Sequence, residues 1–182
     1  MVTCNRDDLF EELGLLRTHG ITKDPSLLHE NHGGWYYEMQ ELGYNYRLTD
    51  FQAALGISQL RRADEGLQRR KRIASRYADA FEGFDKIIGQ SGYVEGHAYH
   101  LYIIEVEDRP GLYNYLRTSN VFAQVHYIPV HLLPYYKNLG WKHGDFPVAE
   151  NYYQHCLSLP MYPTLTDDEQ EYVIEQIKIY LQ

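Results

Sequence analysis

The sequence predicts an α/β protein with few strands and one long helix. Two stretches, residues 99–107 and 121–128, alternate in side-chain character as strands do. Helical patterns lie before, between and after them, and two of the predicted helices begin with capping boxes. A length of 182 residues with 44% apolar content allows a buried core in one domain or in a domain with an appendage.

The N-terminal part of the chain predicts a short strand, a helix and a long loop. Residues 1–4 have strand composition, and Asn5 is placed to cap a helix that ends at His19-Gly20, where glycine favours termination. From residue 21 to residue 47 the periodicity disappears, and glycine, histidine and tyrosine accumulate. A loop of this length in a compact domain usually has a function.

The longest helix is expected from Thr49 to about Gly83. Thr49 followed by Gln52 forms a capping box, and an apolar stripe continues from there. Gly56 and Gly66 are possible points of bending within this helix.

The rest of the chain predicts a small α/β unit. After the strand at residues 99–107, residues 110–118 are expected to be helical, and the strand at residues 121–128 ends at Pro129.

Three further segments complete the predicted unit. Residues 129–136 predict a compact turn or helical segment, and residues 148–157 predict a helix. Thr166 and Glu169 form a second capping box, which opens a terminal helix. The side chains expected to face inward from that helix are Val173, Ile177 and Tyr180.

Composition and charge argue against several classes of protein. A net charge of -8 and a pI near 5.5 argue against nucleic-acid binding, and acidic residues interrupt the basic run at residues 61–72. No apolar run is long enough for a membrane span. Cys4 and Cys156 lack the spacing of a metal site. We therefore expect a cytoplasmic protein that contacts neither nucleic acid nor membrane.

A polar cluster precedes the longest predicted helix, in the stretch GYNYRLTDFQAALG at residues 43–56. A helix N-terminus carries unpaired N–H groups and a partial positive charge, so it attracts anions. Asn45 and Arg47 add a donor amide and a full charge there, which indicates a phosphate site. The structural alternative is that both side chains bond carbonyl groups of the loop.

The segment HYIPVHLLPYY, residues 126–136, is a second candidate site. His126 leaves the predicted strand and His131 follows a proline turn, where side chains can reach a cleft at the end of a strand. They are weak metal ligands because the sequence has no HExxH motif and no clustered cysteine or carboxylate partner. Each histidine is alternatively a surface or core residue. Nucleophile elbows and glycine-rich nucleotide loops are absent from the sequence.

Three segments resemble, in order and interval, the C-terminal half of the DegT/StrS-type nucleotide-sugar aminotransferases: GYNYRLTDFQAALGISQL, QVHYIPVHLLPYY and LSLPMYPTLTDDEQEYVIEQI. That family consists of pyridoxal-phosphate enzymes of aminotransferase fold type I, so the resemblance implies part of that fold, with a small mixed or antiparallel sheet and packed helices. GGWYYEMQELGYNYR and HYIPVH are most similar to the branch that aminates UDP-linked 4-keto-6-deoxy-N-acetylhexosamines in pseudaminic acid biosynthesis. The implied amino donor is glutamate.

The resemblance also implies roles for segments and residues. Residues 1–20 would belong to the large cofactor domain, residues 21–48 would form an interface loop in a homodimer, and residues 49–182 would hold the long helix and the small domain. Asn45 would donate to the pyridoxal phosphate of the neighbouring subunit, and Arg47 would face the same pocket or the substrate diphosphate. The residues expected on the sugar-nucleotide side are His126, His131 and Tyr135.

The lysine that binds the cofactor in this family stands in a Ser-x-His-x-x-Lys segment, which the sequence lacks. The resemblance places that segment before the position that matches Met1. We therefore expect no catalytic residue in this chain and no activity of the chain alone. The alternatives are a noncatalytic binding or regulatory module on the same scaffold and, third, an unrelated anion-binding domain.

Overall fold

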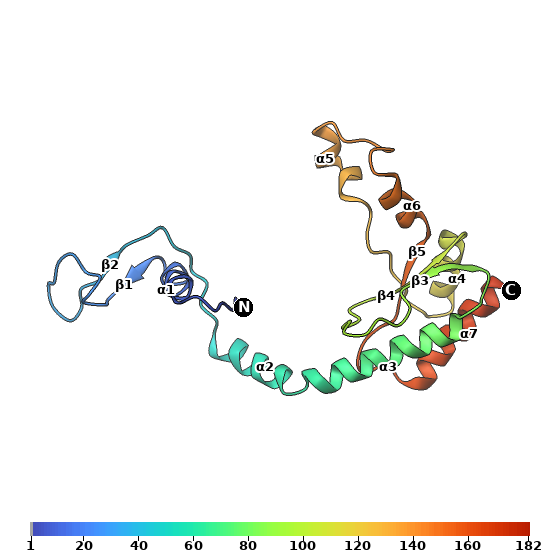
Figure 1. The fold of residues 1–182 in the computed structure, drawn as a ribbon, viewed down its shortest axis with the longest axis horizontal. Coiled ribbons are helices and arrows are strands. Elements are labelled where there is room, and N and C mark those ends of the chain that lie inside the picture. The colour runs from blue at the N-terminus through green and yellow to red at the C-terminus, as the bar shows by residue number, and fades with distance from the viewer. Residues whose placement is uncertain (1) are drawn as a thin grey trace. The chain divides into compact units, whose positions relative to one another are not determined.

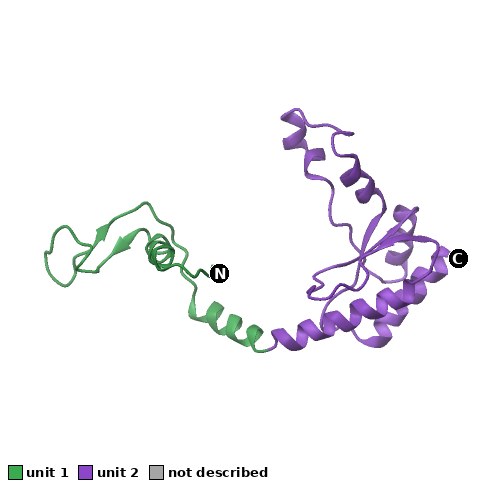
Figure 2. Ribbon diagram, viewed as in Figure 1, with its two compact units in different colours: residues 1–61 green, residues 62–182 purple. Residues whose placement is uncertain are grey.

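The computed structural model describes residues 2–182, and the chain forms two compact units, Met1–Arg61 and Arg62–Gln182 (Figure 2). The first unit contains α1 (Asp7–Leu16), β1 (Ile21–Thr22), β2 (Glu38–Met39) and α2 (Asp50–Leu60) (Figure 1). The second contains α3 (Ala63–Phe81), β3 (Ile87–Gln90), β4 (Tyr102–Val106), α4 (Arg109–Thr118), the 3-10 helix η1 (Val130–Leu132), α5 (Pro134–Asn138), α6 (Pro147–His155), β5 (Cys156–Leu159) and α7 (Asp167–Leu181).

The start of the chain differs from the prediction. Residues 2–4 form no strand with any described residue, and Val2 is 72% exposed, so the predicted strand is wrong there; Met1 lies outside the described residues. Asn5 is not the cap of α1, because Arg6 occupies that position without a capping side-chain bond. Asp7 and Asp8 in the first turn provide the negative charge that favours a helix start.

Just after α1, the backbone at Gly20 passes very close to the backbone at Glu41, and we call this contact the crossing. His19 and Gly20 adopt positive φ angles of 65° and 68°. A Cβ atom on Gly20 would lie 1.8 Å from the carbonyl oxygen of Glu41, so only glycine fits. Beside it, the N–H of His19 donates to the carbonyl of Tyr44 (2.8 Å), and the N–H of Tyr44 donates to the carbonyl of Leu16 (2.6 Å).

The segment expected to be a loop, residues 21–47, contains a short antiparallel strand pair. Strand β1 pairs with β2 through Ile21–Met39 and Thr22–Glu38. Each strand is two residues long, too short for an alternating pattern in the sequence.

The predicted single helix over residues 49–83 is wrong. Two helices, α2 and α3, replace it, and they separate at Arg61-Arg62 rather than at either predicted glycine. Arg62 has φ −106° and ψ 1°, outside the helical region. Asp64 and Glu65 lie in the first turn of α3, where acidic side chains favour the start of a new helix.

Both predicted capping boxes are confirmed. The N–H of Gln52 donates to Thr49 Oγ1 (3.4 Å), and the N–H of Thr49 donates to Gln52 Oε1 (3.0 Å). At α7, Glu169 and Thr166 make the same pair of bonds at 3.2 and 2.8 Å. Each box satisfies two amide groups that a helix start otherwise leaves unpaired.

A three-stranded antiparallel sheet in the order β3–β4–β5 lies at the centre of the second unit. Alternate residues of β4 are fully buried, and helices α3, α4 and α7 contribute the other side chains of one core. The large side chains that this core buries completely include Tyr77, Tyr102, Ile73, Ile104, Leu112, Leu116, Leu157 and Ile177. The predicted helices at residues 110–118 and 166 onward and the strand within residues 99–107 are confirmed.

The predicted strand at residues 121–128 is wrong as a strand. Only an isolated bridge between Gln124 and Ser158 forms there. The predicted alternation still holds, because Val121 and Ala123 are buried while Phe122 is exposed. The structure also corrects the predicted helix at residues 148–157, since its last two residues begin β5 directly after α6.

The segment after Pro129 is helical, as predicted, and consists of η1 and α5. In Figure 1, η1, α5 and α6 form an excursion that projects from one end of the sheet. We refer to residues 129–155 as the excursion. It carries two of the three predicted substrate residues.

Candidate functional site

Asn45 and Arg47 lie on the exposed backbone that leads into α2. Asn45 forms an isolated bridge with Thr18, and the N–H of Tyr46 donates to the carbonyl of Arg17 (3.0 Å). The Asn45 and Arg47 side chains are exposed, and neither makes a hydrogen bond to residues 2–182. Their donors therefore do not bond loop carbonyl groups and are available to a ligand.

Tyr44 and Tyr46 flank Asn45 and stack on each other. Their ring centroids are 4.9 Å apart with an interplanar angle of 9°. Because successive side chains of an extended segment point to opposite sides, Asn45 lies on the side away from this tyrosine pair. The stacked rings and the bridge to Thr18 together fix the backbone from which Asn45 projects.

The N-terminus of α2 offers fewer amide donors than the sequence suggests. The capping box occupies the N–H groups of Thr49 and Gln52, which leaves those of Asp50 and Phe51. The carboxylate of Asp50 also places a negative charge at the same end. An anion here would consequently depend on the Asn45 and Arg47 side chains more than on the helix itself.

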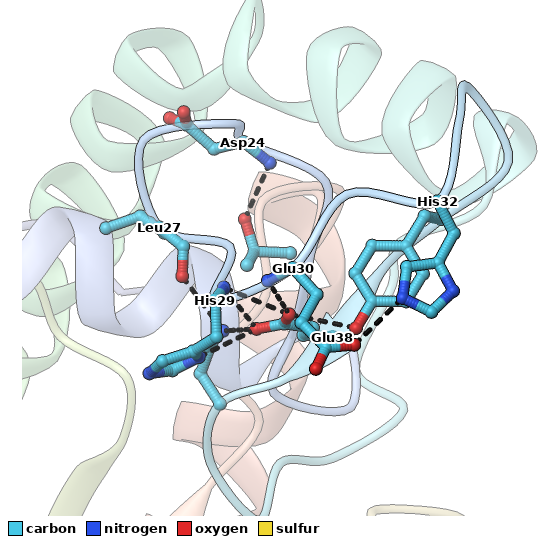
Figure 3. Close-up of polar contacts among 9 residues, drawn as sticks. Asp24, Leu27, His29, Glu30, His32 and Glu38 are labelled. Atoms are coloured by element: carbon cyan, nitrogen blue, oxygen red, sulfur yellow. Dashed lines mark hydrogen bonds and ion pairs between the residues drawn. The ribbon is translucent and has the colours of Figure 1, made fainter.

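A carboxylate closes the loop upstream in the same unit (Figure 3). Glu38 accepts hydrogen bonds from the N–H groups of His29 (3.0 Å to each oxygen) and Glu30 (2.9 Å), from the Tyr36 hydroxyl (3.0 Å) and from Gln40 Nε2 (2.9 Å). His29 Nδ1 lies 2.8 Å from Glu38 Oε2. These bonds, led by the backbone bond from His29, lower the pKa of Glu38 to about 2.

Acidification is expected to loosen this loop as the pH falls from the ordinary glutamate pKa of 4.5 toward about 2. The pKa is depressed in the folded loop, so the stabilisation is present above 4.5 and is lost as Glu38 becomes protonated. Amide exchange at residues 29 and 30, followed by NMR across this range, measures the change. Glu38→Gln should abolish the pH dependence, and Glu11→Gln on α1 should retain it. Equal dependence in both variants would contradict the assignment.

In the second unit, the structure gives the three predicted substrate residues different environments. His126 is half-buried, and its Nδ1 lies 2.8 Å from Ser158 Oγ. His131 in η1 is 7% exposed, whereas Tyr135 in α5 is 70% exposed. Tyr135 is thus open to solvent, and His131 is mostly enclosed by protein.

The partner of His131 is Glu150, which the sequence reasoning missed. His131 Nε2 lies 2.7 Å from Glu150 Oε1, and His143 Nε2 lies 3.1 Å from Oε2. The N–H groups of Gly144 (2.9 Å) and Phe146 (3.3 Å) also donate to this carboxylate. Burial opposes ionisation of Glu150, but the bond from His131 and the two backbone bonds outweigh it and lower the pKa of Glu150.

Glu150 gives little sign of this role in the sequence. A glutamate in the first turn of a helix is usual, and its histidine partner lies 19 residues upstream. The one available indication is the position of Glu150 four residues after Phe146 on the enclosed face of a short helix.

Within residues 2–182, no three histidine, cysteine or acidic side chains are placed to hold a metal ion. None of the helices formed by those residues combines the length and the apolar character needed to cross a bilayer. A cavity of about 550 Å³ lies beside α7, with Phe122, Tyr162 and Tyr172 in its wall, and none of the predicted site residues lines it.

Residues 1–178 match the DegT/DnrJ/EryC1/StrS aminotransferase family. The chain is 39% identical to the spore coat polysaccharide biosynthesis protein SpsC of Bacillus subtilis, covering 98% of this chain and 48% of that protein. It is 32% identical to the UDP-4-amino-4,6-dideoxy-N-acetyl-beta-L-altrosamine transaminase of Campylobacter jejuni, covering 94% of this chain and 45% of that protein.

Solved structures give the same result. The PMP form of the putative sugar aminotransferase Spr1654 from Streptococcus pneumoniae is similar with a TM-score of 0.86 and 32% identity, over 98% of this chain and 46% of that one. Its PLP form gives a TM-score of 0.84. This similarity confirms the predicted fold class, a part of the aminotransferase fold with a small antiparallel sheet.

The chain spans about half the length of the curated relatives it matches. The match covers both units, and it includes the loop with Asn45 and the excursion with His131. The chain therefore belongs to the DegT/DnrJ/EryC1/StrS aminotransferase family.

Proposed function

We propose that this chain is part of a pyridoxal-phosphate-dependent nucleotide-sugar aminotransferase and contributes contacts to the cofactor phosphate and to the sugar nucleotide. The observation that carries the proposal is the pair of free donor side chains, Asn45 and Arg47, on a fixed backbone at the start of α2. When bound, the cofactor supplies the electron sink for amino transfer. This chain would supply binding and orientation.

The two side chains suit a phosphate group of a neighbouring subunit. An amide N–H₂ and a guanidinium are both donors, and charge-assisted bonds to phosphate are about twice as strong as neutral ones. The full charge of Arg47 also offsets the carboxylate of Asp50 at the same helix end. Both residues fit the cofactor phosphate, with Arg47 alternatively facing the diphosphate of the substrate.

The proposed substrate is a UDP-linked 4-keto-6-deoxy-N-acetylhexosamine, with glutamate as the amino donor. The name of the Campylobacter jejuni relative supports this class. His126, His131 and Tyr135 would lie on the sugar-nucleotide side, where the exposed Tyr135 ring offers an apolar face and a polar tip. We place the reaction in the cytoplasm.

Association into a homodimer is supported by the surface of α2. Four large apolar side chains of this helix are at least half exposed: Phe51, Leu55, Ile57 and Leu60. Phe51 and Leu55 lie one turn apart on one face of the helix, and Ile57 and Leu60 lie on the opposite face. Apolar surface exposed to this extent marks association sites. A second copy of the protein would cover it and bring Asn45 to the neighbouring cofactor.

We further propose that the Schiff-base lysine is not among the residues of this chain. None of its lysines stands in a Ser-x-His-x-x-Lys segment. Incubation with pyridoxal phosphate followed by borohydride reduction should therefore leave no lysine stoichiometrically modified. A stoichiometric adduct on one lysine, located by mass spectrometry, would contradict this.

The phosphate assignment can be tested in a chimaera that joins the upstream half of Bacillus subtilis SpsC to this chain. Arg47→Ala should weaken cofactor retention by about 10- to 100-fold, since a bond to a charged group contributes about 1.5–3 kcal/mol. Asn45→Ala should weaken it by about fivefold. Absorbance and fluorescence titration of the cofactor measure both.

The matched control is Arg61→Ala, because Arg61 is an exposed arginine at the opposite end of α2. Its cofactor affinity should equal that of the unsubstituted chimaera. Unchanged affinity in the folded Arg47 and Asn45 variants would overturn the assignment of both residues.

A further inference from the structure

Glu150 is the most deeply buried charged residue of the excursion. Its hydrogen bond to His131 determines which nitrogen of the His131 ring carries a hydrogen. A carboxylate accepts hydrogen bonds but donates none, so the nitrogen 2.7 Å from Glu150 Oε1 must carry the hydrogen. That nitrogen is His131 Nε2. The other ring nitrogen, Nδ1, makes no hydrogen bond to residues 2–182. When the ring is neutral, a hydrogen on Nε2 leaves Nδ1 as an acceptor.

The same carboxylate joins three parts of the excursion. His131 belongs to η1, Gly144 and Phe146 belong to the turn before α6, and Glu150 itself lies in α6. The His131 ring packs on Phe146 with centroids 4.8 Å apart, and Phe146 packs on Trp141 at 5.5 Å. Tyr135 projects from α5, which follows η1 after a single residue.

A buried carboxylate of this kind is a poor way to gain stability alone. Desolvation of the charged Glu150 offsets the hydrogen bonds that it accepts, and apolar side chains of similar volume often stabilise a buried site equally well. What a carboxylate with four donors does provide is one defined arrangement of its partners. The side chains of Glu150 and His131 are only 5% and 8% exposed, so solvent competes little with this arrangement.

We propose that Glu150 is a positioning residue of the substrate site. Its carboxylate selects the His131 tautomer whose Nδ1 accepts hydrogen bonds. The same carboxylate holds η1 in place, and with it the adjoining α5, so that Tyr135 is presented beside His131. This rests on the proposed function, in which His131 and Tyr135 contact the sugar nucleotide. The ligand group that meets His131 is then a donor, such as a sugar hydroxyl or an acetamido N–H. A diphosphate oxygen, which only accepts, does not suit this nitrogen.

Glu150→Gln in the full chain tests the positioning directly. The amide oxygen can still accept from one partner, but its N–H₂ group faces the N–H donors of Gly144 and Phe146 or the ring nitrogen of His143. Two-bond ¹H–¹⁵N spectra should show a single Nε2–H tautomer of His131 in the unsubstituted chain. The variant should show mixed tautomers and faster amide exchange at Gly144 and Phe146.

Two further variants separate positioning from loss of folding. Glu175→Gln, on the exposed side of α7, should leave the His131 spectrum unchanged. Glu150→Asp keeps the charge but is one methylene shorter, so it should not restore the single tautomer. Amides of β4 and α7 should keep their exchange protection in all three variants, which shows that the second unit remains folded.

The chimaera with the SpsC upstream half links positioning to substrate. Glu150→Gln should raise KM for the sugar nucleotide by at least about tenfold while cofactor affinity stays unchanged. An unchanged His131 spectrum, or an unchanged KM despite an altered spectrum, would overturn the positioning role. Failure of the unsubstituted chimaera to bind cofactor or sugar nucleotide would instead overturn the proposed function, and this role with it.

Discussion

Replacing Tyr77 with alanine is expected to lower the free energy of unfolding of the second unit by about 3–5 kcal/mol. Tyr77 is completely buried, and its ring packs on Tyr102 and Phe81 with centroids 5.1 and 6.0 Å apart. Its hydroxyl donates to the carbonyl of Pro160 (3.1 Å). Alanine would leave a large cavity between α3 and the sheet and an unsatisfied carbonyl.

The matched control is Tyr77→Phe, which keeps the ring and removes only the hydroxyl. The expected loss is about 1 kcal/mol. Urea denaturation followed by tryptophan fluorescence measures both, in a Trp35→Phe background so that Trp141 reports on the second unit alone. A loss below about 1 kcal/mol for the alanine variant would contradict the packing described here.

Replacing Gly20 with alanine is expected to open the backbone crossing in the first unit. The positive φ of 68° alone costs a residue with a side chain about 1–2 kcal/mol. The Cβ atom would also lie 1.8 Å from the carbonyl oxygen of Glu41, a contact that forces the backbone apart. Protection from amide exchange at His19 and Tyr44 should be lost, because their bonds adjoin the crossing.

Gly14→Ala serves as the control, since a Cβ atom there meets nothing within 4 Å and Gly14 lies inside α1. This substitution should stabilise the helix by about 0.5–1 kcal/mol. The two alanine substitutions should thus act in opposite directions in thermal unfolding of the first unit. If both substitutions shifted the unfolding temperature in the same direction, the close contact between Gly20 and Glu41 would be contradicted. In the chimaera, Gly20→Ala should also weaken cofactor binding, because the crossing holds the backbone of Asn45.

The features that the sequence predicted correctly depend on residues close together in the chain. Both capping boxes involve residues three apart, and α4 begins where Pro110 and the N-cap Asp108 favour a helix. Strand β4 was recognised from its own alternation. Such elements can be predicted from the sequence because the residues that determine where they begin and end lie within a few positions of one another.

The features that were missed depend on contacts distant in sequence. Strand β5 is a strand because β4 pairs with it, although its residues continue the pattern of α6. Residues 121–128 alternate like a strand, yet only Gln124 finds a partner, Ser158. The break at Arg61-Arg62 falls within an unbroken helical pattern. In the first two cases pairing with a segment distant in sequence decides the outcome, and a single sequence contains little of that information.

The candidate site was predictable to a similar degree. The exposed donors of Asn45 and Arg47 stand before α2, where the sequence placed them. The capping box that identified this helix also uses two of the amides that had been assigned to an anion. The sequence predicts His131 as a ligand contact but not its partner, since a bond between residues 131 and 150 depends on how the excursion folds back.

The two ends of the excursion are attached to the sheet in different ways. Upstream, the bridge between Gln124 and Ser158 and the contact of His126 Nδ1 with Ser158 Oγ connect it to β5. Downstream, α6 runs into β5 with no intervening residue, and Arg109 donates to the carbonyls of Tyr153 and Gln154 (both 3.3 Å). Because no residue separates α6 from β5, any displacement of α6 would be passed directly to the sheet.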